Sequence, residues 1–413
     1  MRKDIIQEIA SANNEAVQRI NAAEPVLIDI RPAIEVIPGM TKKTILHAGP
    51  PIEWKKMCGP MRNGVICGVL YEGLAETPKE AKEMVEAGEI RLEPCHEHGA
   101  VGGMTGITTA STQVFVVKNE TYGNEAYCHL HEGYKDNAMH FGSIEYNEVI
   151  THLNWMKDVL VPILKIGIKS MGGLNVKNVM SQALQSGFDE LHSKHTVANS
   201  IMIKRIIPHI VRADVDREQV AEVFDFLDKS DIFFLHIVMA ACRATIDPAK
   251  NIEYSTVVTT LCRNGVEFGV RVSSLGEQWF TGPADMIRGP TYPAYKPEDS
   301  CLDLGDSSIT ETVGLGGIIQ PTGMKYTETI KHVGKMKKIA SGESKHYLLP
   351  LLNFRGAPTG FDIRKIVKTK IRPVINTAMA HRVKGGKIGI GTAKAPLQCF
   401  TKALKAFSEK YAV

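Results

Sequence analysis

The spacing of apolar residues changes twice along the chain, and this constrains the fold more than any other feature. Between about residues 144 and 250, apolar residues recur three and four apart, as at Val149, Leu153, Met156 and Leu160, which is typical of amphipathic helices. On both sides of this stretch, short β-type runs are separated by Gly and Pro, which favours strands and turns. The pattern therefore predicts an α+β protein in which a helical unit is flanked by two mixed regions.

The chain of 413 residues is longer than a single core usually supports. We therefore expect a multi-domain protein with an N-terminal mixed α/β domain over residues 1–143, a helical domain over 144–250 and a C-terminal mixed α/β domain over 251–413. The apolar stripes of the helical domain predict a surface for self-association or for a partner, and a homo-oligomer is expected.

Local signals predict individual elements inside these regions. An amphipathic helix opens the chain, and Tyr122-Gly-Asn is a plausible hairpin turn between two strands. The predicted strands are Val26–Ile30, Thr44–His47, Gln113–Lys118, Ala126–His131 and Val266–Val272, and the predicted later helices lie near Ser308–Gly317, Lys325–Ala340, Phe361–Thr369 and Cys399–Ala412.

Charge and cysteine usage exclude several classes of protein. The net charge is only +4, from 49 basic and 45 acidic residues, which argues against a nucleic-acid surface. The longest apolar run, Ile232–Cys242, is interrupted by His236 and is too short to span a membrane. The start of the chain lacks a signal-peptide pattern, and the eight cysteines form no CxxC pair. We therefore expect a cytoplasmic protein with reduced thiols.

The segment Glu93–Gly106 is the densest candidate for chemistry. It holds Cys95 and two histidines, followed by glycines whose backbone N–H groups can approach a phosphate or a carboxylate closely. The alternative is a glycine-rich turn whose histidines bond to nearby backbone. Ligand pairs at zinc spacing are missing, so neither a metal site nor a cofactor is predicted. The predicted roles are catalysis for His96 and His98, and substrate binding for Gly99, Gly102, Gly103 and Thr105.

Three arginines complete the predicted site for a small anion. Arg271 follows the tight turn at Asn264-Gly265. Arg355 is expected where an extended run of leucines, 348–352, ends, and Arg364 near the start of a helix, where negative charge is favoured. The alternative for Arg355 is a structural pair with Asp362.

Other histidine and glycine patterns can be explained by structural roles as well as by ligand binding. The segments Ile45–Pro51 and Cys58–Gly68 predict either a pair of structural turns or a ligand loop. Asp189–His195 is expected to be helical, with His192 and His195 on one face, either as a metal pair or, more simply, as a solvated helix end. His129 and His131 are expected at the surface.

Together, motifs along nearly the whole chain resemble the YlbE/YahG-like family, which includes AllG-type subunits of oxamate carbamoyltransferase. Two positions depart from the family pattern as we read it, Glu97 and the pair Lys194-His195. The motifs are HAGPP (47–51), EPCHEHGAVGGMTG (93–106), DELH (189–192), RNGVEFGVRVS (263–273), WFTGPA (279–284), GDSSITETVGLGG (305–317), FRGAPTGFDIRK (354–365) and VINTAMAHR (374–382).

The resemblance implies a subunit of an enzyme of allantoin and purine breakdown. Its implied reaction converts oxalurate and phosphate into oxamate and carbamoyl phosphate. The implied partners are an FdrA-like subunit and a third small-family subunit. Two alternatives stay open, namely a non-catalytic binding or assembly subunit of that complex and a stand-alone hydrolase of ureido or amide substrates.

Overall fold

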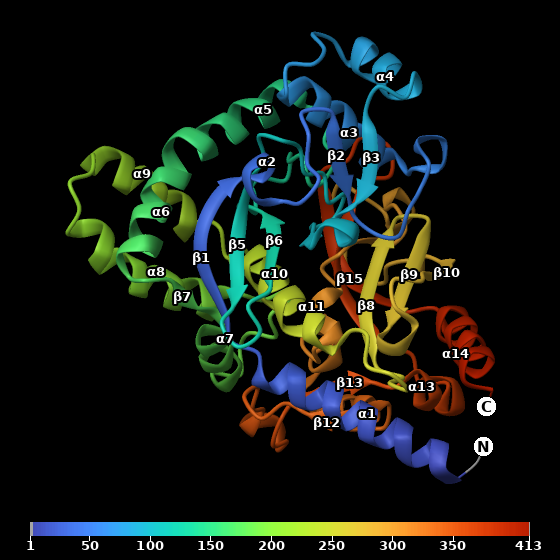
Figure 1. Ribbon diagram of the computed structural model, residues 1–413. Coiled ribbons are helices and arrows are strands. Elements are labelled where there is room, and N and C mark those ends of the chain that lie inside the picture. Colours follow the sequence, from blue (N-terminus) through green and yellow to red (C-terminus); the bar gives the residue numbers. More distant parts are fainter. Residues whose placement is uncertain (1–2, 413) are drawn as a thin grey trace.

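The computed structural model describes residues 3–412 and confirms the predicted α+β fold (Figure 1). A five-stranded sheet and a four-stranded sheet lie on opposite sides of the helices α10 (Leu235–Ile246) and α11 (Ile309–Thr312). Helix α10 packs on the five-stranded sheet, and α11 packs on both α10 and the four-stranded sheet. These two helices therefore connect the two halves of the molecule.

The five-stranded sheet comes from the N-terminal region and one strand of the helical unit. Its order is β4-β6-β5-β1-β7, and all neighbours are antiparallel except β4 and β6. The predicted hairpin joins β5 to β6, with Gly123 at φ +77° in its turn. The strands are β1 (Pro25–Pro32), β4 (Ala100–Val101), β5 (Gln113–Asn119), β6 (Glu125–His129) and β7 (Leu174–Asn175).

The remaining strands form one antiparallel sheet of order β10-β9-β8-β11 and three two-stranded ladders, β12-β13, β14-β15 and the parallel β2-β3. Their bounds are β2 (Thr44–His47), β3 (Arg91–Pro94), β8 (Val258–Asn264), β9 (Glu267–Val272), β10 (Phe280–Pro283), β11 (Leu304–Gly305), β12 (Ala340–Glu343), β13 (Pro358–Phe361), β14 (Val374–Ala380) and β15 (Lys387–Lys394).

The helical unit is present where the periodicity predicts it. It consists of α5 (Tyr146–Trp155), the π-helical turn η3 (Met156–Leu160), α6 (Val161–Ser170), α7 (Val176–Gln185), α8 (Thr196–Val211), α9 (Arg217–Asp228) and α10. Every residue of α10 from His236 to Ile246 is buried, because the sheet covers one side of this helix and α7 and α11 cover the other. The apolar run that is too short for a membrane is thus a central core helix.

The other helices surround the sheets. They are α1 (Lys3–Ala22), α2 (Ala33–Val36), α3 (Gly59–Tyr71), α4 (Pro78–Glu86), α12 (Tyr326–Lys337), α13 (Ile363–Thr369) and α14 (Leu397–Tyr411). Short 3-10 turns are η1 (Trp54–Lys56), η2 (Cys95–His98), η4 (Asp247–Ala249), η5 (Ser273–Leu275), η6 (Pro297–Asp299), η7 (Gly316–Ile318) and η8 (Pro350–Leu352).

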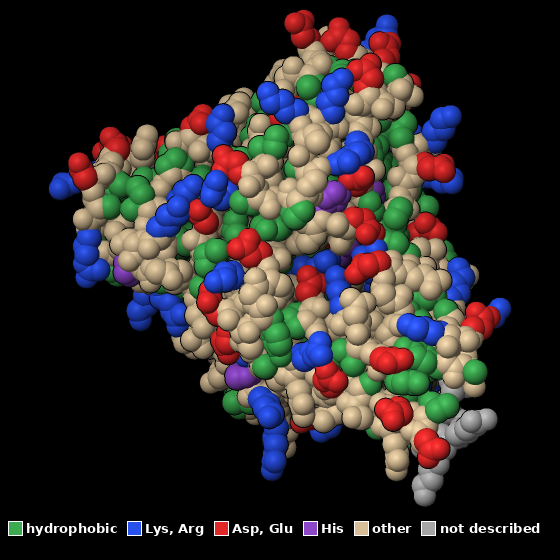
Figure 2. Space-filling view, in the orientation of Figure 1, with side chains coloured by type: hydrophobic (Ala, Val, Ile, Leu, Met, Phe, Trp, Pro, Cys, Tyr) green, Lys and Arg blue, Asp and Glu red, His purple; other side chains and the backbone are tan. Residues whose placement is uncertain are grey.

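The largest apolar core crosses the boundaries of all three predicted regions, from Ala12 to Ala380. A second core joins Ile9 of the first helix to the four-stranded sheet and to α13 and α14. Among residues 3–412, no helix combines the length and apolarity that crossing a bilayer requires. Acidic and basic side chains are interspersed over the face shown in Figure 2.

Three local predictions are wrong. Residues 59–71 form helix α3 rather than turns, because Gly64 and Gly68 let it approach Ile107 and Thr109, where an added Cβ would lie 2.7 and 2.8 Å from a side-chain carbon. Residues 348–352 are not an extended run, since Pro350 opens the turn η8. The helix expected over Ser308–Gly317 is one turn long.

The histidine assignments outside the glycine-rich segment are also wrong. Residues 189–195 are not helical, and both His192 and His195 are buried. His129 and His131 are 3% and 1% exposed rather than at the surface. His129 and His131 are buried because α10 packs against β6, and His131, His192 and His236 line one pocket.

Candidate functional site

The glycine-rich segment does hold a carboxylate, but it is the chain's own. The backbone N–H of Gly102 donates to Asp306 Oδ2 over 3.0 Å, and that of Gly49 donates to Asp306 Oδ1 over 2.7 Å. Asp306 is fully buried. The anion cradle predicted for a substrate is therefore filled by a side chain about 200 residues later in the sequence.

His96 belongs to the same cluster. Arg243 Nη1 donates to His96 Nδ1 over 2.6 Å, and His96 Nε2 lies 3.4 Å from Asp306 Oδ1. Burial lowers the pKa of His96, and the nearby arginines Arg243 and Arg271 lower it further, against the opposing effect of Asp306. Because an arginine can only donate, the proton of neutral His96 lies on Nε2, toward Asp306.

A metal ion does not suit this cluster as it stands. Ligand atoms of His96, Cys262 and Asp306 lie within 4.8 Å of one another. However, the bond from Arg243 leaves Nε2 of neutral His96 with a proton instead of a free lone pair, and a metal needs the lone pair.

Arg271 lies beside His96, and its charge is already paired. Its guanidinium forms ion pairs with Glu97 and Glu277 and stacks 3.9 Å from the ring centre of Trp279. The same tryptophan meets the His96 ring edge-on at 5.9 Å. The structure thus brings together His96, Gly102 and Arg271 from the predicted site.

The other predicted residues lie elsewhere. His98 contacts Pro38 O at 2.6 Å and Glu93 at 2.7 Å, and Gly99 is the left-handed turn that follows it, with φ +68°. Arg364 pairs with Asp362, the N-cap of its own helix, with Nη2–Oδ2 at 2.8 Å. Arg355 is exposed in the loop between η8 and β13.

A pocket of about 520 Å³ lies on the other side of the glycine loop. We call it the histidine pocket, because four histidines contribute to its wall. It is lined by Gly103, Met104, His131, His140, Phe141, His192, Ser193, Ile232, Leu235, His236, Ser307, Thr377, Ala378, Lys387 and Ile390. No larger residue fits at position 103, since a Cβ on Gly103 would lie 2.3 Å from His236 Nε2.

His140 is fixed by a buried carboxylate. Its Nδ1 lies 2.8 Å from Glu132 Oε1, and Glu132 also accepts the backbone N–H groups of Met139 and His140. Burial alone would raise the pKa of Glu132, but these hydrogen bonds lower it. His140 Nε2 is buried and has no hydrogen-bond partner. A histidine oriented by a carboxylate, with its second nitrogen free, is the arrangement of a general base.

The glycine-rich segment supports His140 directly. The backbone N–H of Thr105 donates to His140 O over 2.9 Å, and Thr105 Oγ1 donates to Met139 O over 3.2 Å. The predicted substrate-binding hydroxyl of Thr105 is therefore used to hold the segment that carries His140.

His192 repeats the pattern on the opposite segment. Its Nδ1 lies 2.7 Å from Glu311 Oε1, and Glu311 also accepts the N–H groups of Gly317 and Asn376. Both His192 and Glu311 are buried. The pocket thus contains two carboxylate–histidine pairs.

A wider vestibule of about 1010 Å³ adjoins the histidine pocket, and Phe141, Ser193, Ile232 and Lys387 line both. Three further lysines, Lys135, Lys194 and Lys229, line the vestibule but not the histidine pocket, and with Lys387 they outnumber the two aspartates of the same lining, Asp136 and Asp231. Burial lowers the pKa of Lys387, with Asp136 acting in the opposite direction. We call this cavity the lysine vestibule. A path lined by lysines attracts anionic ligands.

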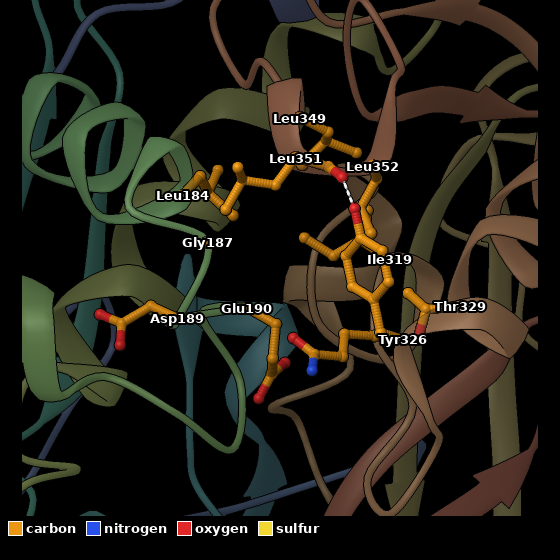
Figure 3. A pocket seen from close by; sticks show the side chains of 11 residues that line it. Leu184, Gly187, Asp189, Glu190, Ile319, Tyr326, Thr329, Leu349, Leu351 and Leu352 are labelled. Atoms are coloured by element: carbon orange, nitrogen blue, oxygen red, sulfur yellow. Dashed lines mark hydrogen bonds between the residues drawn. The ribbon is translucent and has the colours of Figure 1, made fainter.

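A separate leucine-rich pocket of about 460 Å³ lies behind the 189–195 segment. Figure 3 shows Asp189 and Glu190 on one side of it and Leu184, Leu349 and Leu351 on the other. Burial raises the pKa of Glu190 to about 7 and that of Asp189 to about 6. The segment is the wall between two cavities, because Glu190 lines this pocket while His192 and Ser193 line the histidine pocket.

A family model described as Oxamate carbamoyltransferase subunit AllG matches residues 90–307. The chain belongs to the AllG family. The match contains His96, the glycine loop and all four histidines of the pocket, whereas Thr377 and Lys387 lie beyond it.

Full-length relatives support the family assignment. The chain is 46% identical to YahG of Escherichia coli K12, over 99% of the chain and 88% of that relative. It is 39% identical to the oxamate carbamoyltransferase subunit AllG of the same organism, over 98% of the chain and 99% of that relative. A crystal structure of a conserved protein from Enterococcus faecalis V583 has a TM-score of 0.94 at 41% identity and covers 98% of this AllG-family chain and 99% of its own.

Sequence reasoning missed most of the pocket. Glu132, His140, Lys387 and Arg243 carry no local motif. Two signals were available: the alternation of His129 and His131 along one strand face, and His236 inside the otherwise apolar run Ile232–Cys242. A polar, ionisable side chain in a buried helix needs a partner, and here that partner is the backbone carbonyl of His129.

Proposed function

We propose that this chain is the oxamate-binding subunit of a carbamoyltransferase that converts oxalurate and phosphate into oxamate and carbamoyl phosphate, in purine breakdown in the cytoplasm. The observation that carries the proposal is that His140 lines the histidine pocket, where Glu132 orients its ring through Nδ1 and Nε2 has no hydrogen-bond partner. Membership in the AllG family supports the reaction class.

The proposed chemistry needs one base and no redox step. A phosphate oxygen attacks the carbamoyl carbon of oxalurate, the bond from that carbon to the amide nitrogen breaks, and a C–O bond to phosphate forms. The proton of hydrogen phosphate passes to His140 Nε2 and then to the departing amide nitrogen, so that oxamate leaves as a neutral amide. The negative charge of Glu132 stabilises the imidazolium that forms in between.

His96 and the glycine loop then act as positioning groups. Asp306 connects His96 to the N–H of Gly102, and the next residue, Gly103, lines the pocket. In this proposal Arg243 and Arg271 hold the His96 cluster together, and Lys387 holds the substrate carboxylate. His98, Arg355 and Arg364 contribute no lining to the pocket and have no role in it.

As partners we propose an FdrA-like subunit and a third small-family subunit, with self-association of this chain. A non-catalytic assembly role and a stand-alone hydrolase are the alternatives. An assay of oxalurate cleavage separates the hydrolase from a subunit of the transferase complex. Cleavage by the isolated chain without phosphate indicates a hydrolase, whereas cleavage that needs both phosphate and the partner subunits supports the transferase.

The variant His140→Asn tests the site, because the asparagine amide can still donate to Glu132 while Nε2 is removed. We expect kcat of the assembled enzyme to fall by about 10²- to 10⁴-fold, the usual contribution of a general base. His209→Asn, on α8 away from both cavities, is the matched control. An unchanged kcat in correctly folded His140→Asn, which also points to the assembly role, contradicts the proposal.

A further inference from the structure

The histidines of the pocket have their protons fixed by what their Nδ1 atoms contact. His140 and His192 place Nδ1 against the carboxylates of Glu132 and Glu311, at 2.8 and 2.7 Å. An ionised carboxylate only accepts, so Nδ1 carries the proton in both rings. In the neutral ring, Nε2 then presents a lone pair.

His236 also carries its proton on Nδ1, whereas His131 carries its proton on Nε2. His236 Nδ1 donates to His129 O over 2.8 Å, which leaves a lone pair on Nε2. In contrast, the N–H of Gly133 donates to His131 Nδ1 over 3.0 Å, so the His131 proton is on Nε2. Among the four histidines that line the pocket, Nε2 is therefore an acceptor in His140, His192 and His236 and a donor in His131.

The charge around these nitrogens is unfavourable for a dianion. Burial and the neighbouring histidines lower the pKa values of His131 and His236, so both rings are neutral. The buried carboxylates of Glu132 and Glu311 lie behind two of the acceptors. Among the residues that line the pocket, Lys387 is the one lysine or arginine.

Phosphate and an amide place different demands on such a wall. Hydrogen phosphate presents mainly acceptor oxygens, which would face three lone pairs, and the donors against them are the His131 N–H and Lys387, so burying a dianion there is costly. An amide or ureido group presents N–H donors to the three acceptors and a carbonyl oxygen to the His131 N–H.

We propose that the histidine pocket binds the amide or ureido end of a small monoanion through N–H to Nε2 hydrogen bonds, and that it excludes phosphate, which binds in the lysine vestibule. This inference rests on the proposed function and divides its two substrates between two adjoining cavities. Phosphate meets the carbamoyl carbon where Lys387 lines both cavities.

Calorimetry on the full chain at pH 7.5 tests the division, with oxamate, N,N-dimethyloxamate and inorganic phosphate as probes. Folding is not in question for the first comparison, because the change is made in the ligand. Oxamate should bind at least tenfold more tightly than its dimethyl analogue, which lacks both N–H groups. Phosphate should not displace oxamate, and Lys194→Gln with Lys229→Gln should weaken phosphate and leave oxamate unchanged.

Several results would overturn the inference. These are equal binding of oxamate and its dimethyl analogue, no oxamate binding at all, competition between phosphate and oxamate, or a phosphate affinity that the lysine double variant does not change. A full equivalent of zinc displaced by oxamate would also overturn it, since the lone pairs would then hold a metal. Selective oxamate binding without carbamoyl transfer by the assembled enzyme would instead refute the proposed function and leave this inference intact.

Discussion

The Glu132→Gln substitution is the sharpest probe of the His140 pair. Glutamine matches glutamate in size, but its NH₂ group replaces one of two carboxylate oxygens, either Oε2, which accepts the N–H of Met139, or Oε1, which accepts the backbone N–H of His140 and contacts its Nδ1. If that NH₂ faces the ring, it donates to Nδ1, and the His140 proton moves to Nε2. The nitrogen that faces the pocket is then a donor and can no longer accept a proton.

The structure sets the size of two separate effects. Losing the base should lower kcat of the assembled enzyme by about 10²- to 10⁴-fold. Leaving one of three buried N–H groups without its charged acceptor should lower the free energy of unfolding by about 1–3 kcal/mol, which lowers the melting temperature without unfolding the chain.

The stability effect has a defined pH dependence. Hydrogen bonding lowers the pKa of Glu132 below its ordinary value of 4.5, so the carboxylate stabilises the fold above that pH and loses this effect as the pH falls through the folded-state pKa. The stability difference between wild type and Glu132→Gln should therefore shrink in acid. The assays are carbamoyl phosphate formation and thermal melting, with the exposed Glu145→Gln as control. Wild-type kcat in the folded variant would refute the reasoning.

Three further substitutions test other parts of the structure. Gly49→Ala should unfold or strongly destabilise the chain in thermal melts, because its Cβ would lie 2.5 Å from Asn264 N at φ +82°, whereas Gly123→Ala, in open space at φ +77°, should cost only about 1 kcal/mol. Since burial raises the pKa of Glu190 to about 7, wild type should lose stability relative to Glu190→Gln as the pH rises from about 4.5 to 7, and parallel curves would contradict this. Arg355→Lys should leave the melting temperature unchanged, because Arg355 is exposed. It should also leave KM for oxalurate unchanged if the histidine pocket binds substrate. A raised KM would instead indicate that the substrate anion binds at the loop that carries Arg355.

Several elements of the fold could be predicted from short sequence patterns. The strand Thr44–His47 and the hairpin at Gly123 follow from β-type and turn residues, which act over a few positions. The glycines of α3 led to a wrong prediction of turns. Gly64 and Gly68 instead allow the helix to pack closely against Ile107 and Thr109, about forty positions later in the sequence.

The site was harder to predict because its residues converge from distant segments. His140, His192 and His236 are about fifty residues apart from one to the next, and Lys387 is a further 150 away. The glycine loop was predicted to hold a substrate anion, and nothing local indicates that the N–H of Gly102 donates instead to the chain's own Asp306. Long-range packing of α10 and the 189–195 segment decides these partners.

The position of bound oxamate tests the central claim most directly. A crystal structure of the chain soaked with oxamate should show its amide nitrogen about 3 Å from His140 Nε2, inside the histidine pocket. Oxamate bound instead against Arg271 and Trp279, beside His96, would contradict the account and return the reaction to the glycine-rich segment.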